Sequence, residues 1–184
     1  RLRDELAIPM LYVSHAVDEV ARLATTLAVL DAGRVRAAGP VDEVFGALGV
    51  PGAPGTVGDD AGVLLRGRVA EHDRAHAMAR VDFDGGSLWL TDDGLAPGRE
   101  VRVRVLARDV SVTRAEPQRT SIQNHWPAVV DAIAAERHPA QRLLRLRCGG
   151  SMLHARITGR AVAALRLQPG DAVWAQVKSA ALAR

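Results

Sequence analysis

The chain is poor in cysteine, in aromatic residues and in long apolar runs, and each scarcity excludes a class of protein. Cys148 is the only cysteine, so neither an intrachain disulfide nor a cysteine-based zinc site can form. Aromatic residues make up 3% of the 184 residues, too few for a base-stacking surface, so the net charge of +3 does not indicate nucleic-acid binding. No run reaches the roughly 18 apolar residues that span a bilayer, and the first residues lack the apolar core of a signal peptide. We therefore expect a globular, cytoplasmic protein that binds no nucleic acid.

Lysine is also scarce. Lys178 is the only lysine among the 24 basic residues, and all the others are arginines. Two interpretations remain open at this point. The lone lysine is a chance survivor in an arginine-rich composition, or it stands where a compact ammonium group cannot be replaced by a planar guanidinium.

Residues 1–45 alternate between helical and strand-like patterns. The apolar run at 10–13 is typical of a buried strand, and the polar pair Ser14 and His15 follows it directly. Acidic residues then fall where they suit the first turn of a helix. The pattern predicts a fragment of an α/β domain. Further elements are expected as a strand at 27–30, a return strand at 34–37 and a short helix at 41–45.

The order of strand, Ser-His pair, acidic helix, hairpin and closing helix resembles the end of the nucleotide-binding domain of ABC-transporter ATPases. The matching residues are 9–20, 29–35, and Gly-Pro at 39–40 with Glu-Val-Phe at 43–45. In that family the histidine after the strand reaches the γ-phosphate of ATP, so the resemblance implies this catalytic role for His15. An imidazole can donate a hydrogen bond to a phosphate oxygen that gains charge during transfer.

The other parts of such an active site are missing from this sequence. It contains no Gly-rich phosphate loop ending in Gly-Lys-Ser or Gly-Lys-Thr, no Leu-Ser-Gly-Gly-Gln signature and no apolar strand ending in Asp-Glu. ATP and Mg²⁺ are therefore expected only in a full-length subunit, and we predict that this chain alone has no ATPase activity. Phosphate release that His15→Ala abolished would contradict this expectation.

The remainder of the chain divides by composition. Residues 46–62 are dominated by glycine, proline and small residues, which indicates a flexible linker. Short alternating runs then predict an all-β, barrel-like domain with two subdomains, at 63–116 and 117–184. In the first of them, strands are expected at 66–70, 77–83, 87–90 and 101–105.

An internal repeat supports two subdomains of similar plan. The pattern Leu-x-Pro-Gly-x-x-Val-x-Val-x-Val at 95–105 returns at 167–177 with alanine in place of one valine. The Asp-Gly-Gly-Ser turn at 84–87 is echoed by Cys-Gly-Gly-Ser at 148–151. A repeated pattern of strands and turns of this kind predicts two copies of one small β-barrel.

The second copy resembles the molybdate-binding Mop domain that ends the ATPase subunit of molybdate importers. The resemblance covers residues 117–182 and rests on Thr-Ser-x-x-Asn at 120–124, on Lys-Ser at 178–179 and on the residues at 155–160. Residues 63–116 resemble the preceding TOBE-like subdomain more loosely. The resemblance implies that the anion is held by Ser121, Lys178 and Ser179, that Asn124 braces the loop, and that Ala155 and Thr158 lie near the site.

The chemistry of the ligand agrees with this set. Molybdate and tungstate are tetrahedral dianions with acceptor oxygens only, so a site needs hydroxyl and N–H donors and a cation, without an uncompensated carboxylate. Gln123 departs from the family, because many Mop sequences have arginine there and a neutral amide does not offset the charge of a dianion. Arg156 is a candidate to supply the missing charge. No metal site is expected, since His72 and His76 have the spacing of a helical metal pair but lie in a predicted loop or hairpin segment with no third ligand.

Three functions remain as alternatives. The resemblance favours the tail of a molybdate-importer ATPase, which would pair with a second copy of itself and with integral-membrane permease subunits at the inner face of the membrane. A molybdate-responsive transcription regulator would need a winged helix-turn-helix, which residues 1–45 do not resemble. A TOBE domain that serves another importer as a non-sensing spacer is the third alternative, and an anion titration separates it from the first.

Overall fold

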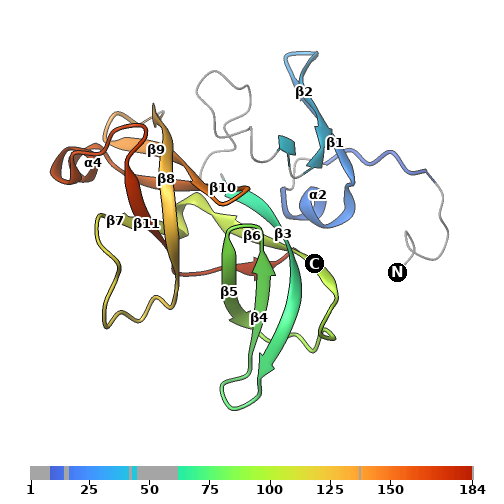
Figure 1. Ribbon diagram of the computed structural model, residues 1–184. Helices are drawn as coiled ribbons and strands as arrows, with labels where there is room; N and C mark the ends of the chain where they lie inside the picture. The colour runs from blue at the N-terminus through green and yellow to red at the C-terminus, as the bar shows by residue number, and fades with distance from the viewer. Residues whose placement is uncertain (1–8, 15–16, 42, 45–61, 137, 184) are drawn as a thin grey trace.

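A computed structural model describes residues 9–14, 17–41, 43–44, 62–136 and 138–183 (Figure 1). Two five-stranded antiparallel sheets dominate this part of the chain, and a separate two-stranded hairpin lies near its amino-terminal end. The predicted β domain is therefore confirmed. No helix among the described residues is long and apolar enough to cross a membrane.

The first sheet has the strand order β12-β6-β3-β4-β5. Along its longest strand Val63, Leu65 and Val69 are buried on one face, as period-two alternation predicts, and Arg66 and Arg68 are exposed on the other. Leu64, on that second face, is buried as well. The predicted strands of residues 66–105 are all present. These four strands are β3 Gly62–Asp73, β4 Met78–Phe83, β5 Gly86–Thr91 and β6 Glu100–Leu106. The fifth strand of the sheet, β12 Ala181–Leu182, comes from the end of the chain.

The second sheet has the order β10-β9-β8-β11-β7. Beside it, the short helix α4, Gly159–Leu165, begins at Thr158, whose hydroxyl oxygen accepts a hydrogen bond from the Ala161 N–H at 3.1 Å. A 3-10 turn at Ala107–Asp109 leads into the sheet. The strands are β7 Val110–Thr113, β8 Asn124–Ala135, β9 Gln141–Cys148, β10 Ser151–Thr158 and β11 Ala172–Val177.

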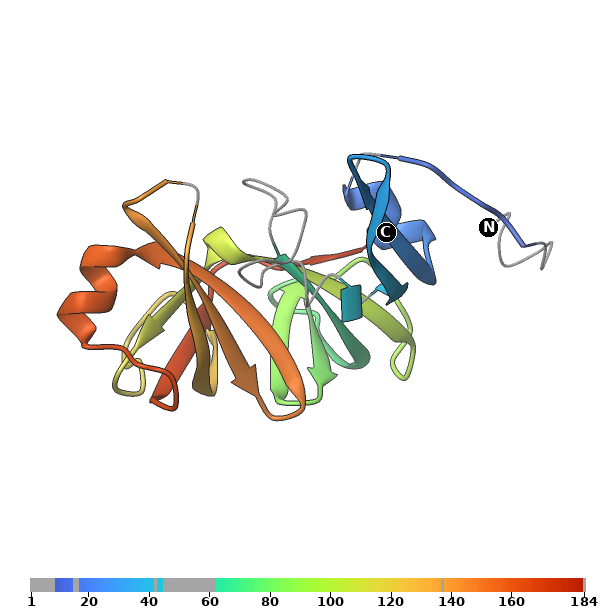
Figure 2. The same cartoon turned by 90° about the horizontal axis from the view of Figure 1, so that it is seen from above.

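The two sheets exchange one strand each. β7 follows β6 in the chain but pairs with β11 of the second sheet, and β12 follows β11 but pairs with β6 of the first. Figure 2 shows the last segment of the chain, in red, crossing from the second unit to the first. Strand pairing therefore crosses the subdomain boundary expected between residues 116 and 117, and each unit contributes a strand to the other.

The internal repeat is visible in matched turns. The Gly98 N–H donates to the Val69 carbonyl and the Gly170 N–H donates to the Val130 carbonyl, both at 2.7 Å. The φ angles of these two glycines, +85° and +93°, lie in the left-handed region that glycine adopts without strain. The repeat predicted at 95–105 and 167–177 is thus confirmed as a structural one.

The two hairpin turns of the repeat meet tip to tip. The strand pairs Phe83 with Gly86 and Cys148 with Ser151 close these turns, so the structural match is shifted by one residue from the sequence echo. A Cβ on Gly149 would lie 2.7 Å from the Cα of Gly85, and one on Gly85 would overlap the Cys148 carbonyl oxygen. Only glycine fits where the two units approach each other this closely.

The amino-terminal unit consists of α2, Val17–Leu23, and a hairpin of β1, Thr26–Asp31, and β2, Arg34–Pro40. The predicted helix and hairpin are therefore present, and residues 41, 43 and 44 are helical as expected. Ala21, Val41 and Val44 form a small core with Leu64 of β3. The Arg102 guanidinium also donates to the Ala24 carbonyl at 2.8 Å, which fastens this unit to the first β-subdomain.

The strand predicted at residues 10–13 is wrong for this structure. These residues pair with no strand in the described part of the chain, and the side chains of Leu11 and Val13 are 93% and 86% exposed. An apolar run becomes a strand only when a neighbouring strand accepts its backbone hydrogen bonds. The α/β prediction is consequently met only in its helix and hairpin. The predicted linker, apart from Gly62 at the start of β3, lies outside the described residues.

Candidate functional site

The predicted site residues lie at the ends of two adjacent strands. β8 and β11 are neighbours in the second sheet, and their ladder ends with Asn124 opposite Val177. One step beyond this pair stand Gln123 and Lys178. The adjacency on which the predicted site depends is therefore present, and it brings the Thr-Ser-x-x-Asn and Lys-Ser segments to one end of the sheet.

The chemistry-bearing side chains at this end are open to solvent. Ser121, Gln123, Lys178 and Ser179 are all exposed. The Lys178 backbone N–H donates to the Asp109 carbonyl at 2.9 Å, which fixes the chain as it leaves β11. No carboxylate among the described residues forms an ion pair with the Lys178 ammonium. The cluster thus offers hydroxyl, amide and ammonium donors, as an oxyanion requires.

The turn that carries Ser121 is held locally. The Ile122 N–H donates to the Thr120 hydroxyl oxygen at 3.1 Å, a short-range bond typical of threonine-initiated turns. The His125 ring nitrogen lies 3.3 Å from the Ile122 carbonyl oxygen, and its ring faces Trp174 at 5.8 Å between centroids. These contacts define the entry into β8.

Asn124 differs from the other predicted residues because its side chain is already engaged. Its Oδ1 accepts from the Trp89 backbone N–H at 2.7 Å, and its Nδ2 donates to the Trp89 carbonyl at 2.9 Å. Trp89 belongs to β5 of the first sheet, so this brace joins the two β-subdomains and not merely a loop. Sequence reasoning missed Trp89, because no pattern links it to a residue 35 positions away.

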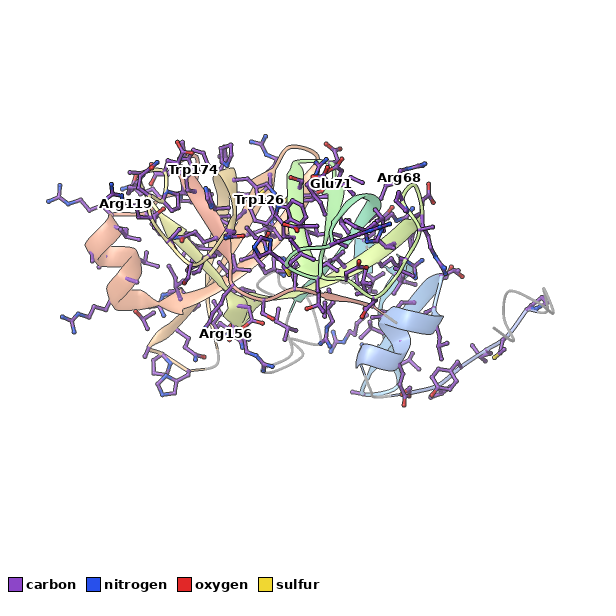
Figure 3. The ribbon with its side chains drawn as sticks, turned by 90° about the horizontal axis from the view of Figure 1, so that it is seen from below. Arg68, Glu71, Arg119, Trp126, Arg156 and Trp174 are labelled. Carbon is purple, nitrogen blue, oxygen red and sulfur yellow. The ribbon has the colours of Figure 1, made fainter. Side chains whose placement is uncertain are left out.

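Three other residues named from the sequence have structural roles. Arg156 pairs with Glu136 at 2.9 Å, and both side chains are about nine-tenths buried. Figure 3 places Arg156 on the opposite side of the second unit from Trp174. This guanidinium therefore already neutralises a carboxylate. Ala155 is fully buried in the core and Thr158 caps α4.

A cleft of about 460 Å³ lies beside Ser179, between α2 and β12. Arg104 lines it, and burial, followed by the nearby charge of Arg108, lowers the pKa of the Arg104 guanidinium. The carboxylates of Glu19 and Asp109 also line the cleft. Because acidic groups offset the cation there, we do not assign the cleft to an anion.

His15 lies outside the described residues. Its neighbour Ser14 is described, and the Ser14 hydroxyl donates to Glu19 of α2 at 2.9 Å. The Tyr12 hydroxyl donates to the same carboxylate oxygen at 2.6 Å. The chain before α2 is therefore tied to the acidic first turn of that helix.

Two histidines of the first β-subdomain and the cysteine are accounted for by local contacts and burial. His72 lies 2.6 Å from Asp92, and His76 lies 2.8 Å from Asp73. Burial raises the pKa of the Cys148 thiol to about 12, so it stays protonated and unreactive. Within the described ranges no group of three or more His, Cys, Asp or Glu could hold a metal ion.

Comparison with known proteins shows which proteins this chain resembles. The TOBE domain model matches residues 120–183. The molybdenum import ATP-binding protein ModC of Methylococcus capsulatus is 51% identical over 182 residues, which cover 99% of this chain and 50% of that protein. Along nearly its whole length, this chain is therefore similar to molybdenum import ATP-binding proteins. The ModC of Thiobacillus denitrificans is 49% identical, over 99% of this chain and 49% of its own length. The chain thus spans about half the length of the curated ModC relatives it matches.

A solved structure provides an independent likeness. A crystal structure of the cytoplasmic molybdate-binding protein ModG, with molybdate bound, matches 65% of this chain and 93% of the ModG chain. The TM-score is 0.55 and the sequence identity is 26%. The β-subdomains of this ModC relative therefore share their fold with a protein that binds molybdate.

Proposed function

We propose that this chain is the carboxy-terminal part of the ATP-binding subunit of a molybdate importer, and that its second β-subdomain binds molybdate or tungstate. The observation that carries the proposal is the identity of about half to ModC proteins along essentially the whole chain. The likeness to a molybdate-bound ModG supports the ligand class.

The proposed anion site consists of Ser121, Lys178 and Ser179, with Gln123 at its edge. All four side chains are exposed at the joined ends of β8 and β11. The two hydroxyls and the ammonium donate to the oxygens of a dianion, and the ammonium supplies the charge-assisted bond, which is roughly twice as strong as a neutral one. Gln123 adds a neutral donor where a guanidinium would add a charge.

The complete subunit would do more than this chain can. We infer that ATP and Mg²⁺ bind in its preceding part, that His15 acts there on the γ-phosphate, and that two copies pair and associate with permease subunits at the inner face of the membrane. The proposed division is an ATPase end at 1–45, a linker at 46–62 and β-subdomains at 63–116 and 117–184. The tie between Ser14 and α2 supports a defined position for the segment next to His15.

A second candidate function is a spacer that senses nothing. Gln123 favours it, because the loss of a family arginine weakens the attraction for a dianion. Isothermal calorimetry of the 184-residue chain with molybdate, tungstate and sulfate separates the two. We expect saturable heat with molybdate and tungstate and weaker binding of the smaller sulfate. Absence of heat with all three anions would establish the spacer.

A further inference from the structure

One side of β5 is a sheet edge that the rest of its own sheet does not cover. β5 is the terminal strand in the order β12-β6-β3-β4-β5. An edge strand presents backbone N–H and C=O groups that have no partner in the sheet. Such a group costs free energy when it is buried without a hydrogen bond. At Trp89 both groups are bonded to the amide of Asn124, at 2.7 Å and 2.9 Å. One side chain thus replaces the peptide group that a neighbouring strand would offer.

The same residue is the first of β8. Its backbone pairs with Val177, the residue before Lys178, and its sequence neighbour is Gln123. Asn124 is therefore joined to the first β-subdomain through its side chain and to the proposed anion site through its backbone. Trp126, two residues further along β8, is 4% exposed and meets Phe83 edge-on at 5.3 Å, so the seam next to this brace is packed.

We propose that Asn124 is a positioning residue, which latches β8 to β5 and holds the turn at 120–123 and Lys178 in place, and that it does not contact the anion. This inference rests on the proposed function. Nδ2 carries two N–H groups and donates one of them to Trp89, while Oδ1 accepts from the Trp89 N–H, so turning the amide toward an anion would break both bonds to Trp89. Oδ1 accepts hydrogen bonds only and would repel an oxyanion.

The first subdomain supports the assignment by contrast. Val63 pairs with Val105 in β3 as Asn124 pairs with Val177 in β8, and the repeat aligns the two pairs. Valine cannot form such a latch. The subdomain with the Lys-Ser pair has the latch, and the subdomain with Leu106 and Ala107 at those positions lacks it.

Amide hydrogen exchange at Trp89, followed by NMR on the whole chain, tests the latch directly. Without anion, Asn124→Ala should raise the exchange rate of the Trp89 N–H at least about tenfold, because its acceptor is removed. Asn124→Asp keeps the acceptor for the Trp89 N–H and loses the donor to the Trp89 carbonyl. Its Trp89 exchange rate should therefore lie between the rates of the unmodified chain and of Asn124→Ala, and it replaces the alanine variant in this test if that variant does not fold. In the unmodified chain saturated with molybdate, Trp89 should stay protected. Faster exchange at Trp89 on adding molybdate would show that the anion takes the amide, and would overturn the proposal.

Anion affinity supplies the second measurement. Asn124→Ala should weaken molybdate and sulfate binding by the same factor, about tenfold or the equivalent of about 1.4 kcal/mol, because the residue acts on the geometry of the site. Gln168→Ala, which removes an exposed amide from a turn of the same subdomain, is the matched control and should change neither affinity. A molybdate-specific loss would identify a ligand and contradict the latch. If the unmodified chain binds no molybdate, the proposed function and the positioning role fail together, while the exchange data still decide whether Asn124 latches β5.

Discussion

The two β-subdomains share one plan and differ mainly where their strands end. Both have five strands in corresponding order, both place a Pro-Gly turn before the strand that follows, and each donates a strand to the other. At matched positions the first has Leu106 and Ala107, and the second has Lys178 and Ser179. Ala107 is fully buried, whereas Ser179 is exposed. The two subdomains therefore share their strand framework and differ at the few strand-end residues where the anion site is proposed.

The largest loss of stability is expected from a substitution that disturbs the contact between the hairpin turns of the two subdomains. Gly85→Ala should destabilise the chain by about 3 kcal/mol, because the φ of +136° is almost confined to glycine and the added Cβ would overlap the Cys148 carbonyl. Thermal unfolding followed by circular dichroism measures the loss.

Gly94→Ala is the matched control for that change. Gly94 also has a positive φ, +74°, but a Cβ added there would meet no other atom within 4 Å. The substitution should cost only about 1 kcal/mol. Equal losses for the two variants would mean that contact between the hairpin turns adds nothing to stability.

The next largest effect is expected on molybdate affinity, when the positive charge of Lys178 is removed from the second subdomain. Lys178→Ala should weaken molybdate binding about tenfold or more, and more than Ser179→Ala does, because the ammonium alone carries full charge. The melting temperature should barely change, since an exposed side chain contributes no more than about 0.5 kcal/mol. Leu106→Ala, at the matched position of the first subdomain, should leave the affinity unaltered. Calorimetric titration of the three variants would refute the site if Lys178→Ala bound as well as the unmodified chain.

A smaller effect sharpens the contrast further. Gln123→Arg should tighten binding, because it restores a positive charge opposite Lys178. The gain should be greater at low salt, since exposed charges are screened beyond about 10 Å at 0.1 M salt. Titrations at two ionic strengths measure it. A gain that is independent of salt would argue against a direct charge effect.

The smallest effect concerns the Pro-Gly turn of the second subdomain. A hydrogen bond from Arg114, and then one from the Gln168 N–H, hold the pKa of Asp171 below its ordinary value of 3.8. Because the carboxyl pKa is lower in the folded state than in the unfolded state, ionised Asp171 stabilises the fold at pH values above 3.8. This stabilisation is lost as the pH falls through the lower pKa of the folded state. The melting temperatures of the unmodified chain and Asp171→Asn should therefore converge below about pH 3.8. A difference that persisted unchanged into stronger acid would show that ionisation is not its cause.

Local patterns predicted much of this architecture, and pairing explains what they missed. Alternation predicted the strands between 66 and 105, and the repeat predicted two similar units, because side-chain period and turn residues are local properties. The exchange of β7 and β12 was not predicted, since a strand pattern does not specify its sheet. The strand prediction at 10–13 was wrong because an apolar run does not show whether a neighbouring strand is present, and no strand of the described residues pairs with it.

For the candidate site, the sequence indicated which residues to consider but not all of the contacts that they make. The resemblance named Ser121, Lys178 and Ser179, and the adjacency of β8 and β11 brings their segments together. The engagement of Asn124 with Trp89 could not be read from the chain, because it joins two subdomains through one side chain. The pairing of Arg156 with Glu136 was also missed, although it removes that arginine as a substitute for the charge absent at Gln123.

The number of anions bound per chain tests the central claim most directly. Equilibrium dialysis of the 184-residue chain against molybdate, with the bound metal quantified by mass spectrometry, gives that number without assuming an affinity. We predict one molybdate per chain, held by the second subdomain, and its loss in Lys178→Ala at the same free concentration. Two anions per chain would show that the first subdomain also binds despite Leu106 and Ala107, and none would show that the strand-end residues do not form an anion site.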